Sequence, residues 1–127
     1  MEQIVLDTDI IIDFLRTGKG LFFDLLELQG RNKVELFITA ASIYELFSGQ
    51  SSKTTADDLA DVLSKLHFIP FDFNNARLAG EINRDLNYSL KFADLIIAVA
   101  SLNLNMRLAT KNKKHFTHIP KLKFYSP

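Results

Sequence analysis

Residues 3–15 read QIVLDTDIIIDFL, and this stretch predicts the start of a fold that alternates strands with helices. The apolar run Ile4–Leu6 is typical of a buried strand, and the polar residues that follow it are typical of a helix N-terminus. Apolar residues then continue with helical spacing until Gly18. Asp7 is therefore expected at the carboxyl end of a strand, where open α/β sheets bind their ligands.

The rest of the chain repeats this alternation. Further strands are predicted at residues 36–38, 68–71, 107–110 and 122–125, and helices at residues 21–28, 39–47, 54–66, 74–86 and 93–104. Such an order favours an α/β domain whose mainly parallel sheet, of about five strands, is covered by helices on both faces. Residues 50–53 are predicted to form a flexible loop.

Composition narrows the classes of function. A chain of 127 residues that is 47% hydrophobic has room for one domain, spanning residues 1–127, with a substantial core. The absence of cysteine excludes disulfides, thiolate zinc sites and cysteine nucleophiles. No apolar run approaches the roughly 20 residues that span a bilayer, so a soluble, cytoplasmic protein without a membrane partner is expected.

Three acidic residues, Asp7, Glu45 and Asp94, stand near the ends of predicted elements. Each has an ordinary explanation alone, because Asp7 and Asp94 can cap helices and Glu45 can face solvent. Apolar neighbours suggest instead that Glu45 is partly buried, and a buried carboxylate needs a partner or a metal. Three carboxylates from distant segments are what Mg²⁺ or Mn²⁺ requires. Asp9 and Asp13 are interpreted as first-turn and exposed-face residues.

Signatures of other enzymes are missing from the sequence. It has no GxxxxGK[ST] phosphate loop, no GxGxxG fingerprint, no HExxH zinc motif and no GxSxG elbow. His67, His115 and His118 do not form a convincing set of metal ligands.

Four segments, taken together, resemble the PIN domain, and in particular the VapC-type ribonuclease toxins of toxin–antitoxin modules. They are residues 4–9 (IVLDTD) with Ile12 and Asp13, 42–46 (SIYEL), 93–98 (ADLIIA), and 108–112 (LATKN) with Phe116, and they come in the family's order. The resemblance implies a three-layer α/β/α fold and Mg²⁺- or Mn²⁺-dependent cleavage of RNA phosphodiester bonds. It also implies a homodimer that is neutralised by a small cognate antitoxin protein.

The same resemblance implies roles for individual residues. Asp7 and Asp94 would be ligands of the cation, and Glu45 would hold the water molecules around it. Thr8 and Thr110 would support these carboxylates through hydrogen bonds.

The fourth corner of the site departs from the family pattern. Many PIN nucleases have an Asp where this chain has Asn112, which would complete the catalytic set without bringing a negative charge. A two-metal mechanism is therefore not carried over. Residues 107–127 contain basic but no acidic side chains, and our hypothesis is that Lys111, Lys113 and Lys114 bind RNA.

Two other functions remain open from the sequence. One is a PIN-like module that binds RNA or protein without catalysis, for which Asn112 would be the reason. The other is an aspartyl-phosphate phosphatase, in which Asp7 attacks phosphorus and Asp9 acts as acid and base.

Overall fold

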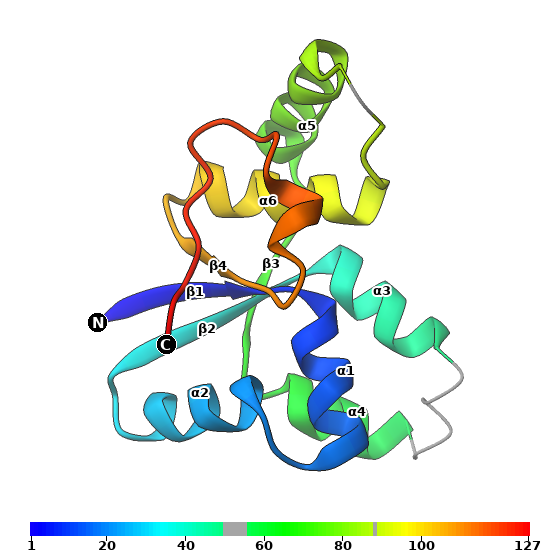
Figure 1. Ribbon diagram of the computed structural model, residues 1–127. Coiled ribbons are helices and arrows are strands. Elements are labelled where there is room, and N and C mark those ends of the chain that lie inside the picture. Colours follow the sequence, from blue (N-terminus) through cyan, green and yellow to red (C-terminus); the bar gives the residue numbers. More distant parts are fainter. Residues whose placement is uncertain (50–55, 88) are drawn as a thin grey trace.

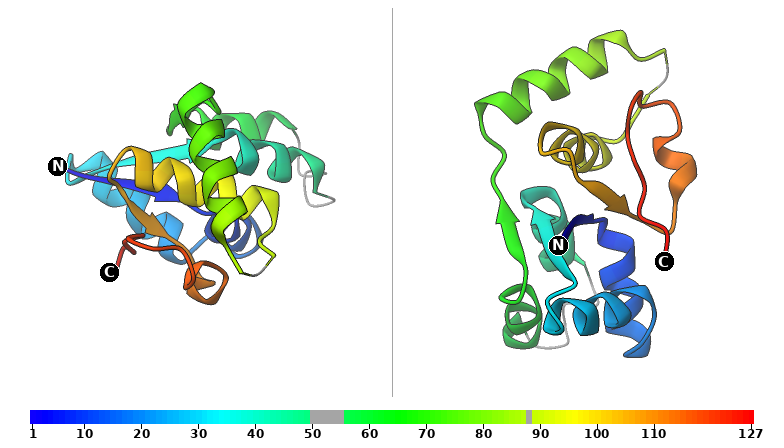
Figure 2. Two further views of the ribbon diagram at one scale, coloured as in Figure 1. Left: turned by 90° about the horizontal axis from the view of Figure 1, so that it is seen from above. Right: turned by 90° about the vertical axis from the view of Figure 1, so that its left-hand side faces the viewer.

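The computed structural model describes residues 1–49, 56–87 and 89–127 and shows a parallel sheet between two layers of helices (Figure 1, Figure 2). This confirms the predicted α/β architecture. The loop predicted at residues 50–53 lies outside the described residues. None of the described helices is both long enough and apolar enough to cross a membrane.

The sheet has strand order β3-β2-β1-β4, and every pairing is parallel. The strands are β1 (Glu2–Leu6), β2 (Val34–Thr39), β3 (His67–Ile69) and β4 (Arg107–Ala109). Residues Ile4, Val5 and Leu6 of the central strand β1 are fully buried, because β1 has a neighbour on each side and helices on both faces. This burial explains why the strand is a continuous apolar run rather than an alternating one.

Helices α1 (Thr8–Thr17), α2 (Leu21–Gly30), α3 (Ala40–Ser48) and α4 (Ala56–Leu63) contribute to one core cluster. Ile4 and Leu6 of β1 point into this core, together with Ile10, Phe22 and Leu46. The left-handed conformation of Gly18, with φ of 72°, ends α1 and lets its N–H donate to Phe14 O.

Helices α5 (Phe73–Asp85) and α6 (Phe92–Asn103) lie on the other face. Val5, which alternates with Ile4 and Leu6, packs there against Ile97 of α6 and Phe116 of the short 3₁₀ helix η2 (Lys113–Phe116). Residues 95–101 of α6 are all buried, because the sheet covers one side of the helix and α5 covers the other. The prediction of a helix buried nearly all round is confirmed.

The predicted fifth strand at residues 122–125 is the main difference between expectation and structure. These residues form only an isolated parallel bridge between Phe124 and Leu108, with the Leu108 N–H donating to Lys123 O and the Tyr125 N–H donating to Leu108 O, both at 2.9 Å. The segment follows Lys121, whose φ is 66°, and meets a strand only three residues long. One point of contact is too little for a ladder, so the sheet of the described residues has four strands rather than five.

Candidate functional site

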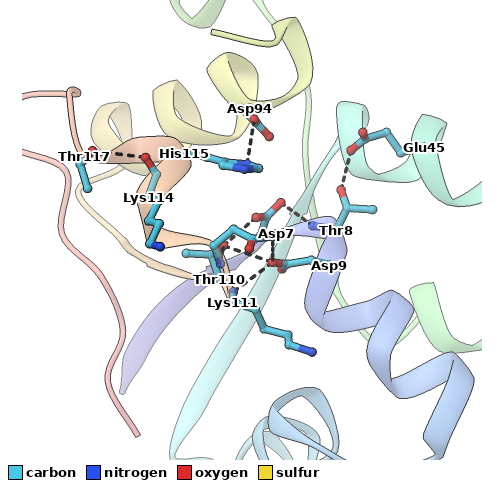
Figure 3. A network of polar contacts seen from close by, with 11 residues as sticks. Asp7, Thr8, Asp9, Glu45, Asp94, Thr110, Lys111, Lys114, His115 and Thr117 are labelled. Carbon is cyan, nitrogen blue, oxygen red and sulfur yellow. Dashed lines mark hydrogen bonds and ion pairs between the residues drawn. The ribbon is translucent and has the colours of Figure 1, made fainter.

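The site lies at the edge of the sheet where the parallel strands end and helices α1, α3 and α6 begin (Figure 3). Asp7 directly follows β1, Asp94 is in the first turn of α6, and Thr110 directly follows β4. Glu45 is in the second turn of α3, which directly follows β2. Parallel strands bring their carboxyl ends to one edge, and segments far apart in sequence meet there for that reason.

Asp7 is both a helix cap and a buried member of the site, with 6% of its surface exposed. Its Oδ1 accepts the Thr8 N–H and its Oδ2 accepts the Thr110 hydroxyl, both at 2.7 Å. Burial, the negative charge of Asp9 and, less strongly, that of Asp94 raise the pKa of Asp7 to about 6, although the Thr110 and Thr8 hydrogen bonds oppose the shift. Asp7 thus lies where negative charge is crowded.

Glu45 is connected to the site by two hydroxyl groups. The Thr8 Oγ1 lies 2.7 Å from Glu45 Oε1 and 2.9 Å from Ser42 Oγ. A carboxylate only accepts, so Thr8 donates its single proton to Glu45 and accepts the proton of the fully buried Ser42. The expectation that Glu45 is partly buried is wrong, because the residue is exposed at the rim and only its Oε1 is held.

Asp94 faces the same space from the opposite helix layer, and 16% of its side chain is exposed. Burial raises the pKa of this carboxyl; the nearby His115 opposes the shift, and Glu45 adds to it. His115 Nδ1 lies 3.6 Å from Asp94 Oδ2. His115 was not predicted to lie beside the site, because it belongs to no recognisable ligand motif.

Asp9 lies in the first turn of α1, as interpreted, but it also takes part in the site, which the sequence interpretation did not expect. Its side chain is half-buried, and its Oδ2 accepts the Lys111 N–H at 3.0 Å and the Asn112 Nδ2–H at 3.1 Å. Its Oδ1 is buried and has no hydrogen-bond partner among the described residues. Burial raises the pKa of Asp9, and the Lys111 N–H opposes the shift. The only signal in the sequence was the Asp7-Thr8-Asp9 spacing at a helix start.

Asn112 and Thr110 close this corner of the site. Asn112 is exposed, but its backbone N–H donates to Thr110 Oγ1 at 2.9 Å while its amide reaches Asp9. Thr110 in turn donates to Asp7. The structure therefore brings together Asp7, Thr8, Glu45, Asp94, Thr110 and Asn112, with Asp9 and Ser42 added to the predicted set.

The three lysines of the RNA-binding hypothesis have different surroundings. Lys111 Nζ pairs with Asp13 Oδ1 at 3.2 Å, and Lys113 Nζ lies 5.7 Å from the centre of the Phe124 ring. Lys114 lines a hollow of about 250 Å³ together with Asp94, His115, Lys91 and two uncharged residues. Lys114 thus borders a hollow that Asp94, one of the site's carboxylates, also lines. Asp13 was expected on an exposed face but is half-buried in its ion pair.

The carboxylates suit a hard divalent cation without forming a closed cage. Across residues 1–49, 56–87 and 89–127, no three His, Cys, Asp or Glu side chains stand close enough to hold a metal ion alone. Mg²⁺, however, keeps several waters and is commonly bound by one or two carboxylates. Two observations fit such an ion: the burial and, after it, the neighbouring negative charge that raise the pKa of Asp7, and the buried, unpartnered Oδ1 of Asp9.

Comparisons with known proteins identify the family and the fold of the chain. The sequence model of the PIN domain family matches residues 4–122. No curated protein matches the chain. Similar folds occur in VapBC2 from Rickettsia felis bound to a promoter DNA fragment (TM-score 0.81, 24% identity, 97% of each chain covered) and in DNA-bound VapBC from Salmonella typhimurium (0.84, 18%, 98% of each). A toxin–antitoxin complex from Klebsiella pneumoniae is also similar (0.72, 22%, 98% of this chain and 99% of the other).

Proposed function

Because the chain belongs to the PIN domain family, we propose that it is a metal-dependent ribonuclease that hydrolyses RNA phosphodiester bonds. The observation that carries this proposal is the meeting of Asp7, Asp9, Glu45 and Asp94 at the carboxyl edge of a parallel sheet, with the pKa of buried Asp7 raised to about 6. Crowded carboxylates are costly unless a cation or a proton neutralises them. The repulsion therefore supports a cation site.

Asp7 and Asp94 are the residues that would hold Mg²⁺ or Mn²⁺, and Glu45 would contact it through water. When bound, such an ion supplies Lewis-acid chemistry that neutralises negative charge on the scissile phosphate. Thr8 fixes Glu45 Oε1 at 2.7 Å, so this exposed carboxylate is oriented to accept a hydrogen bond from an attacking water. The Thr110 hydroxyl likewise donates to Asp7 Oδ2 and so fixes the orientation of that carboxylate.

The lysines that follow β4 would offset the repulsion between this acidic edge and the RNA backbone. Lys114 is best placed, because it borders the hollow that Asp94 and His115 also line. A cation at that position would attract a phosphate next to the scissile one. Lys111 and Lys113 would contribute longer-range attraction, since each already has a partner in the protein.

We further propose that the protein is the toxin of a type II toxin–antitoxin module and a homodimer. Support comes from the similar folds found in VapBC complexes and in a complex described as toxin–antitoxin. A small antitoxin protein would block the acidic groove. Phe71 and Phe92, whose rings are 6.0 Å apart and 38% and 65% exposed, offer apolar surface for a protein partner.

The test is cleavage of end-labelled RNA after any co-purified antitoxin has been removed by denaturation and refolding. We expect cleavage to need added Mn²⁺ or Mg²⁺, to stop with EDTA, and to fall at least about 10³-fold in Asp7→Asn, as when a central catalytic group is lost. Asp24→Asn, which removes an exposed carboxylate of α2, is the matched control and should keep parental activity.

The other functions give different results in this assay. Equal residual cleavage by the parent and Asp7→Asn would identify a contaminating nuclease and contradict the proposal. RNA binding without metal-dependent cleavage would identify a silent module, and a phosphoryl group trapped on Asp7 would identify a phosphatase. Neither alternative is favoured by an observation among the described residues.

A further inference from the structure

The most connected carboxylate oxygen in the site belongs to Asp9, to which the sequence assigned no part in the nuclease. Its Oδ2 accepts the Lys111 N–H at 3.0 Å and the Asn112 Nδ2–H at 3.1 Å, and Thr110 Oγ1 lies 3.4 Å away. All three neighbours come from the segment that directly follows β4. Asp9 therefore ties the first turn of α1 to a segment about a hundred residues later in the chain.

The hydrogen bond between Asp9 and Asn112 requires that only one of the two side chains is negatively charged. An ionised carboxylate has no proton to give, so the group facing Asp9 must be the amide nitrogen of Asn112. An Asp at position 112 would bring a second carboxylate to about the same distance with no donor between the two. Two carboxylates at this distance repel each other, which disfavours the ionised form of both.

The pair is also linked to Asp7. The Asn112 backbone N–H donates to Thr110 Oγ1 at 2.9 Å, and the Thr110 hydroxyl donates to Asp7 Oδ2 at 2.7 Å. The orientation of the Thr110 hydroxyl, and with it that of Asp7, depends on where Asn112 is held. Asp9 holds it.

We propose that Asp9 carries the fourth negative charge of the site, and that Asn112 is its neutral donor partner rather than a lost acidic ligand. This inference rests on the proposed metal-dependent nuclease for its catalytic meaning, but not for its geometry. The charge missing at position 112 is present about 3 Å away, on the other side of one hydrogen bond. Asp9 and Asn112 are positioning residues for Asp7 and Thr110, and the buried Oδ1 of Asp9 makes no hydrogen bond within the described residues.

The experiment exchanges the two side chains. Asp9→Asn, Asn112→Asp and the double variant Asp9→Asn/Asn112→Asp are compared with the parent by thermal unfolding in EDTA and by Mn²⁺ titration with calorimetry. Asn83→Asp, which adds the same charge on the exposed side of α5, is the matched control. Neither measurement needs cleavage activity.

We expect Asn112→Asp to lower the unfolding temperature without metal by about 4 °C or more, and the double variant to regain most of that loss. Asp9→Asn should unfold within about 2 °C of the parent, because an Asn oxygen can still accept from Lys111 and Asn112, but it should bind Mn²⁺ about tenfold more weakly. The double variant should recover the Mn²⁺ affinity to within about threefold.

Several outcomes overturn the inference. It fails if the losses of stability of the two single variants simply add in the double variant, or if Asn112→Asp is as stable as the parent. It also fails if Asp9→Asn binds Mn²⁺ as tightly as the parent does. It stands if the exchange restores stability and Mn²⁺ affinity even when no variant cleaves RNA, a result that would remove only the nuclease proposal. Conversely, a parent that cleaves RNA without any rescue by exchange would keep the nuclease and remove the inference.

Discussion

The two sides of the candidate site are built differently. On the closed side, formed by Asp7, Asp9, Thr110 and Asn112, hydrogen bonds of 2.7–3.1 Å connect every member. On the open side, formed by Glu45 and Asp94, Glu45 is exposed and held by Thr8, and His115 is 3.6 Å from Asp94. The fold thus completes one half of the site and leaves the other half to be organised by a ligand.

The difference follows from how each side is attached to the sheet. Strands β1 and β4 pair side by side, with Leu6 opposite Ala109, so the side chains of the residues just beyond them lie within hydrogen-bond reach of one another. Glu45 and Asp94 project instead from helices in separate layers. Their distance from each other depends on long side chains and on helix packing. Preorganisation is therefore expected on the closed side and adjustment on the open side.

The contrast between the two sides is tested most strongly by the pH dependence of the stability of Asp7→Asn, for which we expect the largest effect. Asp7 has an ordinary pKa of 3.8 in the unfolded chain and about 6 in the folded one, so the folded state holds the proton more tightly. The stability associated with the protonated form is present below about pH 4 and is lost as the pH rises to about 6. Without metal, Asp7→Asn should be of the order of 2–3 kcal/mol more stable than the parent at pH 7, and no more stable at pH 4.

Urea unfolding at both pH values, in EDTA, gives this difference. Asn is a good helix N-cap, so its oxygen can keep the bond to the Thr8 N–H, and its amide can donate to Thr110 Oγ1 in place of the bond that Asp7 accepts from that hydroxyl. Addition of Mn²⁺ should reverse the order, because the ion stabilises only a folded state that binds it. A variant that is less stable than the parent at both pH values would show that the closed side is not under electrostatic strain.

The open side is tested by the hydroxyl that holds Glu45. Thr8→Val keeps the shape of the buried side chain but removes the donor to Glu45 and the acceptor for Ser42. We expect metal-dependent cleavage to fall about 10–100-fold and stability to fall by about 1–3 kcal/mol. Thr8→Ser, which keeps the hydroxyl, should remain near the parent in both.

A double-mutant cycle separates the two consequences of Thr8→Val. If Thr8 acts through Glu45, Thr8→Val should cause no further loss of activity in the Glu45→Gln background, while the loss of stability persists. If Thr8→Val lowers activity equally in the parent and in the Glu45→Gln background, Thr8 supports only the fold. The activity of Glu45 would then not depend on its hydrogen bond to Thr8.

Much of the fold could be predicted because its signals are local. The helix predicted at residues 93–104 is observed as α6 (Phe92–Asn103), and the strand that begins the chain ends at Leu6 as expected. Apolar runs and capping residues report the chain's immediate surroundings, and these determine where elements begin and end. The prediction of a fifth strand was wrong because a strand needs a partner along its length, and β4 pairs with residues 122–125 at only one point.

The site was less predictable for the same physical reason. Asp7 could be placed from its strand, but the burial of Asp9 depends on Lys111 and Asn112, which lie about a hundred residues away. A short acidic side chain in the first turn of a helix usually faces solvent, and no local pattern signals otherwise. The exposure of Glu45 was misjudged because Ile43 and Leu46 pack into the core, whereas Glu45 lies on the exposed side of the same helix together with Phe47.

The smallest expected effect concerns the lysines beside the open side. Lys114→Gln removes a charge from the hollow that Asp94 and His115 line, whereas Lys113→Gln removes one that lies over the Phe124 ring. We expect Lys114→Gln to weaken RNA binding severalfold and to reduce the slope of log affinity against log salt by about 0.7, the value for one contact with a single-stranded phosphate. Lys113→Gln should change the affinity and its salt dependence less.

Filter binding of a non-cleaved RNA to these variants in the Asp7→Asn background measures the affinity, with Lys65→Gln at an exposed position between α4 and β3 as the control. Equal effects of Lys113→Gln and Lys114→Gln would mean that the basic segment acts only as diffuse charge, and that the hollow beside Asp94 is not where the backbone of the RNA lies.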